Sequence, residues 1–154
     1  MNAVELLKAD HEVVSGLFEK VKATDEAEHP QIFTKIKAEL DVHAHIEESL
    51  FYPKLLEEGD EELSSLVREG IEEHRQVKMF LRELHALAEQ SDKFEAKLKV
   101  LMEDIEHHVK EEEGEMFPLV EDQFDSEVLD ELGDAMEEEK KEFNREQTSA
   151  AANN

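Results

Sequence analysis

Apolar residues recur every three or four positions in four long runs, with charged residues between them. This spacing places the apolar side chains on one face of an α-helix, so the pattern predicts four amphipathic helices. The four runs cover about residues 3–23, 30–57, 61–90 and 92–122. A further run over about 126–146 predicts a short additional C-terminal helix, and we expect residues 147–154 to form a flexible tail.

Short breaks separate the predicted helices. Pro30 suits a first helical position, Gly59-Asp60 interrupts the pattern, and Ser91 suits an N-cap. Long helices joined by short breaks pack antiparallel, which favours an all-α, up-down-up-down four-helix bundle. We therefore expect one bundle domain over residues 1–146, with its core within 3–122.

Composition narrows the possible partners. The 154 residues include 42 acidic and 17 basic side chains, which gives a formal net charge of −25. Nucleic acids and anionic membranes both attract positive patches, so neither is an expected partner. The N-terminus lacks a basic segment followed by an apolar run, and no apolar stretch is long enough to span a bilayer. We expect a soluble, cytoplasmic monomer or weak homodimer.

One block of sequence occurs twice, at 43–53 and at 108–118. In each copy a His is followed four residues later by a Glu pair, and ten residues later by a Pro that follows an aromatic residue. One helical turn places a His and a Glu side by side. Because the chain has no Cys, any metal ion must be held by such His and carboxylate groups.

A second repeat completes the pattern. Asp10-His11 is echoed by Glu73-His74, and each lies in the helix preceding one copy of the block. The four histidines fall near the middle of their helices and within the apolar stripes, so an up-down arrangement brings them to one height, pointing inward. Two helix pairs then deliver a pseudo-twofold set of ligands suited to two metal ions. The predicted ligands are His11, His43, Glu47, His74, His108 and Glu112.

Spacing alone does not choose these ligands, since four of the eight histidines have a Glu four residues later. The duplicated context and the mid-helix position favour His43 and His108. The alternative is a set of buried His and Glu side chains that satisfy only one another. That arrangement leaves buried charges without a cation, which is costly.

Other polar residues near the block receive different assignments. His45 and His107 point away from the ligand face, His85 lies too far along its helix, and His29 is expected at the surface. Glu48 and Glu113 either fix an imidazole by a hydrogen bond or face solvent.

The late-helix prolines predict a disturbance just beyond the ligands. The rings of Pro53 and Pro118 clash with the carbonyls of Ser49 and Gly114, four residues earlier. A kink there would bring aromatic side chains over the metal layer. Tyr52 is the most interesting of them, because its phenol either reaches the site or packs with its hydroxyl at the surface.

These motifs together resemble the hemerythrin-like (HHE cation-binding) family, in a short single-domain bacterial form. The residues that carry the resemblance are Asp10-His11, His43, Glu47-Glu48, Phe51-Tyr52-Pro53, Glu73-His74, His108, Glu112-Glu113 and Phe117-Pro118. The resemblance implies an oxo- or hydroxo-bridged pair of non-haem iron ions with four terminal His and two bridging Glu. Zinc or manganese are possible substitutes for iron, since such ligands discriminate poorly between these metals.

One departure from the family bears on function. Oxygen-carrying hemerythrins have a further His one turn after the third-helix His, where this chain has Lys78. The resemblance therefore implies an open coordination position, filled by water, by substrate or by a donor such as Tyr52. We expect catalase-like decomposition of hydrogen peroxide, with Tyr52 adjacent to the metals. Reversible binding or sensing of dioxygen or nitric oxide, and iron storage or buffering, are the alternatives.

Overall fold

The computed structural model describes residues 1–87 and 91–152, which fold into helices joined by short turns with no strand among them. The all-α prediction is confirmed. The α-helices are α1 (Ala3–Ala23), α2 (His29–Ile46), α3 (Tyr52–Glu58), α4 (Glu61–Leu87), α5 (Asp92–Glu111), α6 (Phe117–Gln123) and α7 (Ser126–Ala152). Residues 88–90, where we expected the third helix to end, and 153–154 lie outside the described residues.

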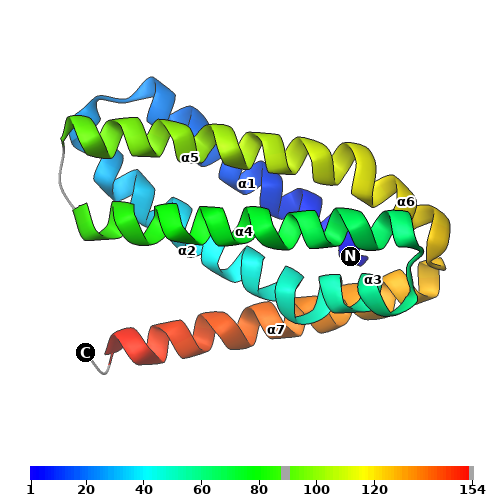
Figure 1. Ribbon diagram of the computed structural model, residues 1–154. Coiled ribbons are helices and arrows are strands. Elements are labelled where there is room, and N and C mark those ends of the chain that lie inside the picture. Colours follow the sequence, from blue (N-terminus) through cyan, green and yellow to red (C-terminus); the bar gives the residue numbers. More distant parts are fainter. Residues whose placement is uncertain (88–90, 153–154) are drawn as a thin grey trace.

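The long helices lie lengthwise beside one another (Figure 1). Helix α1 packs against α2, α4 packs against α5, and α7 packs against both α1 and α2. No helix in residues 1–87 and 91–152 is long and apolar enough to cross a membrane.

Local capping explains where α1 and α5 begin. The Asn2 side chain accepts a hydrogen bond from the Glu5 backbone at 2.9 Å, and the Glu5 carboxylate accepts one from the Asn2 backbone at 3.1 Å. The two groups form a capping box. The Ser91 hydroxyl caps α5 as predicted, because it accepts a hydrogen bond from the Phe94 backbone at 3.1 Å.

The expected disturbance near each late proline takes the form of a single turn of π-helix (a π-turn). The two turns cover Glu47–Phe51 and Glu112–Met116. A proline has no backbone N–H and cannot bond the carbonyl four residues earlier, so the chain widens at this point. The Tyr52 backbone N–H donates to the Glu47 carbonyl, and the Phe117 N–H donates to the Glu112 carbonyl. Both π-turns therefore begin at a predicted ligand.

The apolar core is divided into two clusters along the helices. One contains Leu7, Phe51 and Phe117, and the other contains Phe18, Phe94 and Leu98. Each cluster is made of large side chains that are almost fully buried. The predicted ligands occupy the middle of the helices, between the residues of the two clusters. A polar layer therefore lies between two apolar layers.

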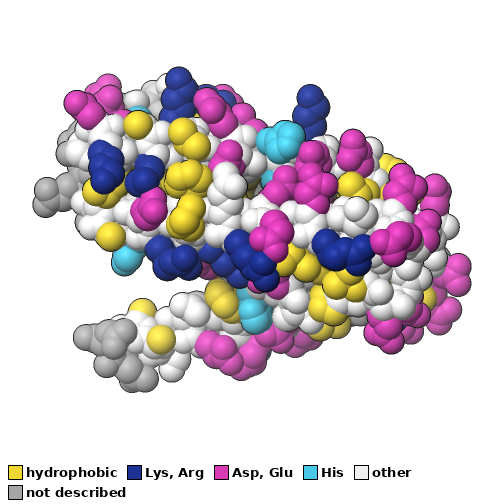
Figure 2. All heavy atoms as spheres, viewed as in Figure 1, with side chains coloured by type: hydrophobic (Ala, Val, Ile, Leu, Met, Phe, Trp, Pro, Cys, Tyr) yellow, Lys and Arg dark blue, Asp and Glu magenta, His cyan; other side chains and the backbone are white. Residues whose placement is uncertain are grey.

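The C-terminal helix differs from its prediction. We expected a short helix that ends at about residue 146, whereas α7 has 27 residues and continues to Ala152. Its first half is anchored by the buried Leu129 and Met136. Gly133 touches the N-terminal backbone so closely that a Cβ there would overlap the Met1 carbonyl oxygen. The last turns of the helix stand apart from the rest of the molecule (Figures 1 and 2), and residues 144–151 are exposed. Because these turns bury no apolar face, the sequence pattern did not indicate how far the helix extends.

His29 was predicted at the surface, and this is wrong. The residue is 7% exposed and begins α2. Its Nδ1 donates to Glu95 Oε2 at 2.8 Å, and its Nε2 donates to the Val21 carbonyl at 2.8 Å. Burial disfavours the charged imidazole, but the Glu95 carboxylate and the Val21 carbonyl outweigh this effect and raise the pKa of His29. A protonated His29 thus ties the end of α1 and the start of α5 to α2.

Replacing His29 with Gln should lower the free energy of unfolding by about 1–3 kcal/mol at pH 6, because hydrogen bonds to a charged group are lost. A raised folded-state pKa stabilises the fold fully below the unfolded pKa of about 6.5, and the gain is lost as pH rises through the folded value. The difference between wild type and variant should therefore shrink by pH 9. Urea denaturation at both pH values measures it, with the exposed His85→Gln as the control. An equal difference at the two pH values would contradict this account.

Candidate metal centre

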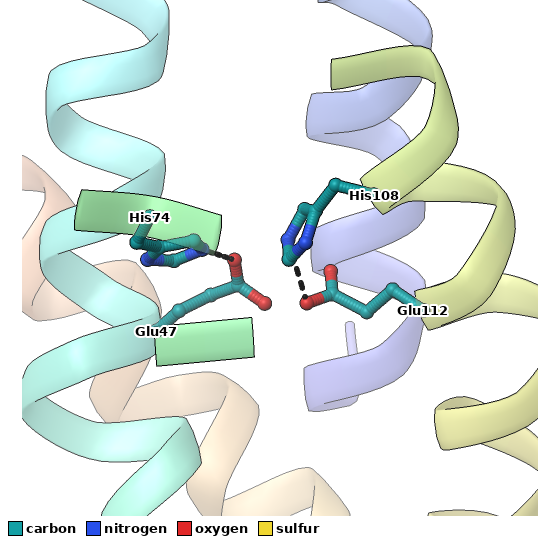
Figure 3. Close-up of side chains that lie close together, drawn as sticks. All are labelled: Glu47, His74, His108 and Glu112. Carbon is teal, nitrogen blue, oxygen red and sulfur yellow. Dashed lines mark ion pairs between the residues drawn. The ribbon is translucent and has the colours of Figure 1, made fainter. Parts of the chain in front are cut away.

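The structure brings all six predicted ligands to one buried layer. His11, His43, His74 and His108 come from four different helices, and the two glutamates begin the two π-turns. Each of the six residues is at most 7% exposed. Figure 3 shows the Glu47 and Glu112 carboxylates facing one another, with His74 and His108 beside them.

Each carboxylate lies between two imidazoles. Glu47 Oε1 is 3.0 Å from His43 Nε2 and 3.2 Å from His74 Nε2. Glu112 places its two oxygens on different partners, with Oε1 at 3.2 Å from His11 Nε2 and Oε2 at 3.2 Å from His108 Nε2. The Nε2 atoms of all four imidazoles thus point to the middle of the layer.

An outer set of carboxylates fixes the four rings. Within each helix pair, Asp10 accepts a hydrogen bond from His43 Nδ1 at 3.0 Å, and Glu73 accepts one from His108 Nδ1 at 2.7 Å. An Nδ1–H donated outward leaves Nε2 free to act as a ligand, which is how proteins orient metal-binding histidines.

The other two rings are fixed across the pairs. Glu48 accepts from His74 Nδ1 at 2.7 Å, and Glu113 accepts from His11 Nδ1 at 2.6 Å. The two alternatives that the sequence left open for Glu48 and Glu113 are therefore decided in favour of the hydrogen bond. Together with Asp10 and Glu73, these residues give each of the four rings one acidic partner at Nδ1. The arrangement repeats the pseudo-twofold relation of the two helix pairs.

The carboxylates determine how this layer is charged in the absence of metal. Burial alone would lower the pKa of His43, but Glu47 and Asp10 raise it to about 10. Burial is likewise outweighed at His108, where Glu112 and Glu73 raise the pKa well above its usual value. Burial opposes the charged form of Glu112, yet His108 and His11 hold its pKa well below the ordinary range. When no metal is bound, the carboxylates therefore favour the charged form of these imidazoles.

Several polar atoms in the middle of the layer have no hydrogen-bond partner among residues 1–87 and 91–152. They are Nε2 of His11, His43 and His108, both carboxylate oxygens of Glu47, and Oε1 of Glu112. Buried polar atoms are normally satisfied, so a cluster of unsatisfied nitrogen and oxygen atoms fits a bound cation. The residues present therefore fit a His and carboxylate metal centre.

The ligand atoms form two groups that share Glu112. Glu47, His74, His108 and Glu112 make one group, and His11, His43 and Glu112 make the other. In each group the ligand atoms lie within 4.8 Å of one another. A third set, formed by Glu73, His107 and Glu111, lies at the surface, where His107 is 65% exposed as predicted.

The Tyr52 hydroxyl lies inside this layer rather than at the surface. It donates to Glu112 Oε2 at 2.7 Å and lies 3.3 Å from His74 Nε2. Burial and the neighbouring carboxylates raise the pKa of Tyr52 well above its usual value, so the phenol keeps its proton. Gly70 makes the room, since a Cβ there would lie 3.0 Å from the Tyr52 hydroxyl oxygen.

Lys78 does not take the place of the missing histidine. Its Nζ contacts Glu48 Oε1 at 2.5 Å, on the outer side of His74. In the second copy of the block, the position of Tyr52 is occupied by Phe117, whose ring stacks on His11 with centroids 6.0 Å apart. The two groups of ligand atoms therefore differ: among residues 1–87 and 91–152, the Tyr52 hydroxyl lies 3.3 Å from Nε2 of His74 in one group, whereas the Phe117 ring stacks on His11 of the other.

Comparison with known proteins agrees with this geometry. Residues 2–120 match the model of the hemerythrin HHE cation-binding domain. The chain belongs to the hemerythrin HHE cation-binding family. The resemblance inferred from the His and Glu repeats is thus confirmed, and a metal-binding role follows for the site as a whole.

Several known proteins resemble the chain along most of its length. An uncharacterized protein from Mycobacterium tuberculosis is 32% identical over 139 residues, which cover 88% of this chain and 83% of the relative. The crystal structure of an HHE domain-containing protein from Mycobacterium kansasii has a TM-score of 0.79 and 29% identity, covering 93% of this chain and 87% of that one. A DNA nickase from Nostoc sp. is 26% identical over 131 residues, which are only 36% of its length.

Proposed function

We propose that this protein is a non-haem di-iron protein that decomposes hydrogen peroxide on an up-down four-helix bundle extended by α7. The observation that carries the proposal is the buried Tyr52 hydroxyl beside Glu112 and His74. In the sequence, Lys78 stands where an oxygen carrier would have a further histidine, and its side chain turns away to Glu48. A position without a protein ligand admits a small oxidant. A protonated phenol next to that position supplies a hydrogen bond to it.

The protein would supply geometry, shielding and a proton donor. His11, His43, His74 and His108 would hold two iron ions, and Glu47 and Glu112 would bridge them. When bound, the iron pair supplies the reversible redox chemistry by which two peroxide molecules become dioxygen and two water molecules. The outer carboxylates keep the rings in place, and the apolar residues on either side limit the access of water.

The orientation of the phenol predicts the effect of its removal. Tyr52→Phe should lower the rate of oxygen release from peroxide at least tenfold, because positioned proton donors contribute about 10²–10⁴-fold to such reactions. Its iron content should stay at the wild-type value. An oxygen electrode and metal analysis measure the two quantities. Phe51→Leu is the matched control, since Phe51 packs beside Tyr52 in the same core but carries no polar group.

The same experiment separates the alternatives. Sustained oxygen release by the iron-loaded wild type supports turnover. A stable coloured adduct without gas would instead favour reversible binding of dioxygen or nitric oxide. Uptake of many iron ions per chain would favour storage. An unchanged rate in Tyr52→Phe would reject the role of the phenol while leaving the metal site intact.

A further inference from the structure

A large cavity leads from the surface to the metal layer. It encloses about 510 Å³, and the rings of His11, His43, His74 and His108 form its inner end. A water molecule takes up about 30 Å³ in the liquid, and a peroxide molecule is only slightly larger. The cavity is therefore much larger than a small oxidant requires and falls within the size range of pockets for organic ligands.

The walls of the cavity are apolar. Six aliphatic side chains from α1, α2, α4 and α5 surround it above the histidine layer: Val14, Leu40, Val77, Leu81, Ile105 and Val109. Such walls favour a ligand with a hydrocarbon body, because apolar surface gains free energy when it leaves water.

The mouth of the cavity carries three cations, Lys37, Lys78 and Arg82. Asp41 pairs with Lys37 at 2.7 Å, and Glu48 pairs with Lys78 at 2.5 Å. Within residues 1–87 and 91–152, Arg82 has no ion-pair partner. Its guanidinium is therefore available to an anionic ligand, in a protein whose net charge is −25.

The surface view agrees with this placement. Lys and Arg side chains gather along the edge of the molecule that faces the C-terminal part of α7, whereas acidic side chains are most frequent at the right-hand end (Figure 2). Phe143 of α7 also lines the cavity and stacks on His45 with ring centroids 4.7 Å apart. His45 in turn contacts Glu139 at 2.7 Å, so α7 covers part of the mouth.

We propose that this cavity binds an aliphatic carboxylate, with its hydrocarbon chain along the apolar walls and its carboxylate at the mouth. An Arg guanidinium can bind a carboxylate through two parallel hydrogen bonds, and Arg82 is the unpaired guanidinium in position to do so. Lys37 and Lys78 line the same cavity and add positive charge near it. The inference goes beyond peroxide chemistry, because the walls and the mouth are built from residues that hold no metal.

Titration calorimetry of the zinc-loaded protein with sodium decanoate tests the proposal. Zinc has no redox chemistry, so the result does not depend on turnover of peroxide. We expect saturable binding of one decanoate per chain. Arg82→Gln should weaken the binding at least fivefold, whereas it should leave the binding of the uncharged decanol within twofold of wild type.

Two further variants complete the test. Val77→Phe fills the cavity with a larger side chain and should weaken the binding of both decanoate and decanol at least tenfold. Circular dichroism checks that the variant folds. Arg68→Gln is the matched control, since Arg68 lies on the same helix about 21 Å from Arg82 and pairs with Glu61. Absence of saturable binding, or equal affinity of wild type and Arg82→Gln for decanoate, would overturn the proposal even if peroxide is decomposed.

Discussion

Replacing Glu112 with Ala should remove both metal ions, whereas replacing His11 with Ala should remove only one. Glu112 belongs to both groups of ligand atoms, and its two carboxylate oxygens face histidines on opposite sides. His11 belongs to one group only. We therefore expect the metal content to fall from about two ions per chain to below half an ion in Glu112→Ala, and to about one in His11→Ala.

Metal analysis after reconstitution and desalting measures these contents. Glu115→Ala is the matched control, because its side chain is exposed and lies close in sequence to Glu112. It should retain the wild-type content. Two ions retained by Glu112→Ala would show that the carboxylate does not join the two groups, and the site described above would then be wrong.

Metal binding should also raise the thermal stability of the protein by about 8–16 °C. A ligand present at 1,000 times its dissociation constant stabilises the folded state by about 4 kcal/mol, and each kcal/mol shifts Tm by about 2–4 °C in a domain of this size. The physical cause is the buried ligand layer, in which six unsatisfied side-chain atoms of five residues gain partners when cations bind.

A thermal melt followed by circular dichroism, with metal and then with chelator, measures the shift. The Glu112→Ala variant should show almost no response to added metal. A shift of the same size in that variant would mean that the stabilising ions bind elsewhere, for instance on the acidic surface.

The sequence predicted the helices and the inner ligands because both follow from periodicity. Four apolar runs predicted four helical segments. The duplicated block indicated that His43 lies beside Glu47 and that His108 lies beside Glu112. Each of these pairs is local, one helical turn apart, so no knowledge of tertiary packing was needed.

The partners of the histidines were harder to predict, because they come from other helices. Asp10 precedes His11 but binds His43, and Glu73 precedes His74 but binds His108. The only signal was the repeated acidic residue before each first His, and that signal does not reveal which ring it contacts. In a chain with 42 acidic residues, the sequence alone does not distinguish a carboxylate that binds an imidazole ring from one that faces solvent.

Two other features depended on packing that a one-dimensional pattern does not contain. His29 is buried because α1 ends and α5 begins beside it. The sequence did not reveal this packing, and the adjacent proline suggested a loop instead. The Tyr52 hydroxyl reaches the layer because the π-turn rotates it inward and Gly70, on another helix, leaves space for it.

Anaerobic titration of the metal-free protein with ferrous iron tests most directly whether the six buried side chains hold a pair of iron ions. The absorption spectrum is recorded after oxidation, and the bound iron is counted by metal analysis. We expect saturation at two iron ions per chain, with a charge-transfer band that Glu112→Ala lacks. Saturation at one ion, or no retained iron, would contradict the account.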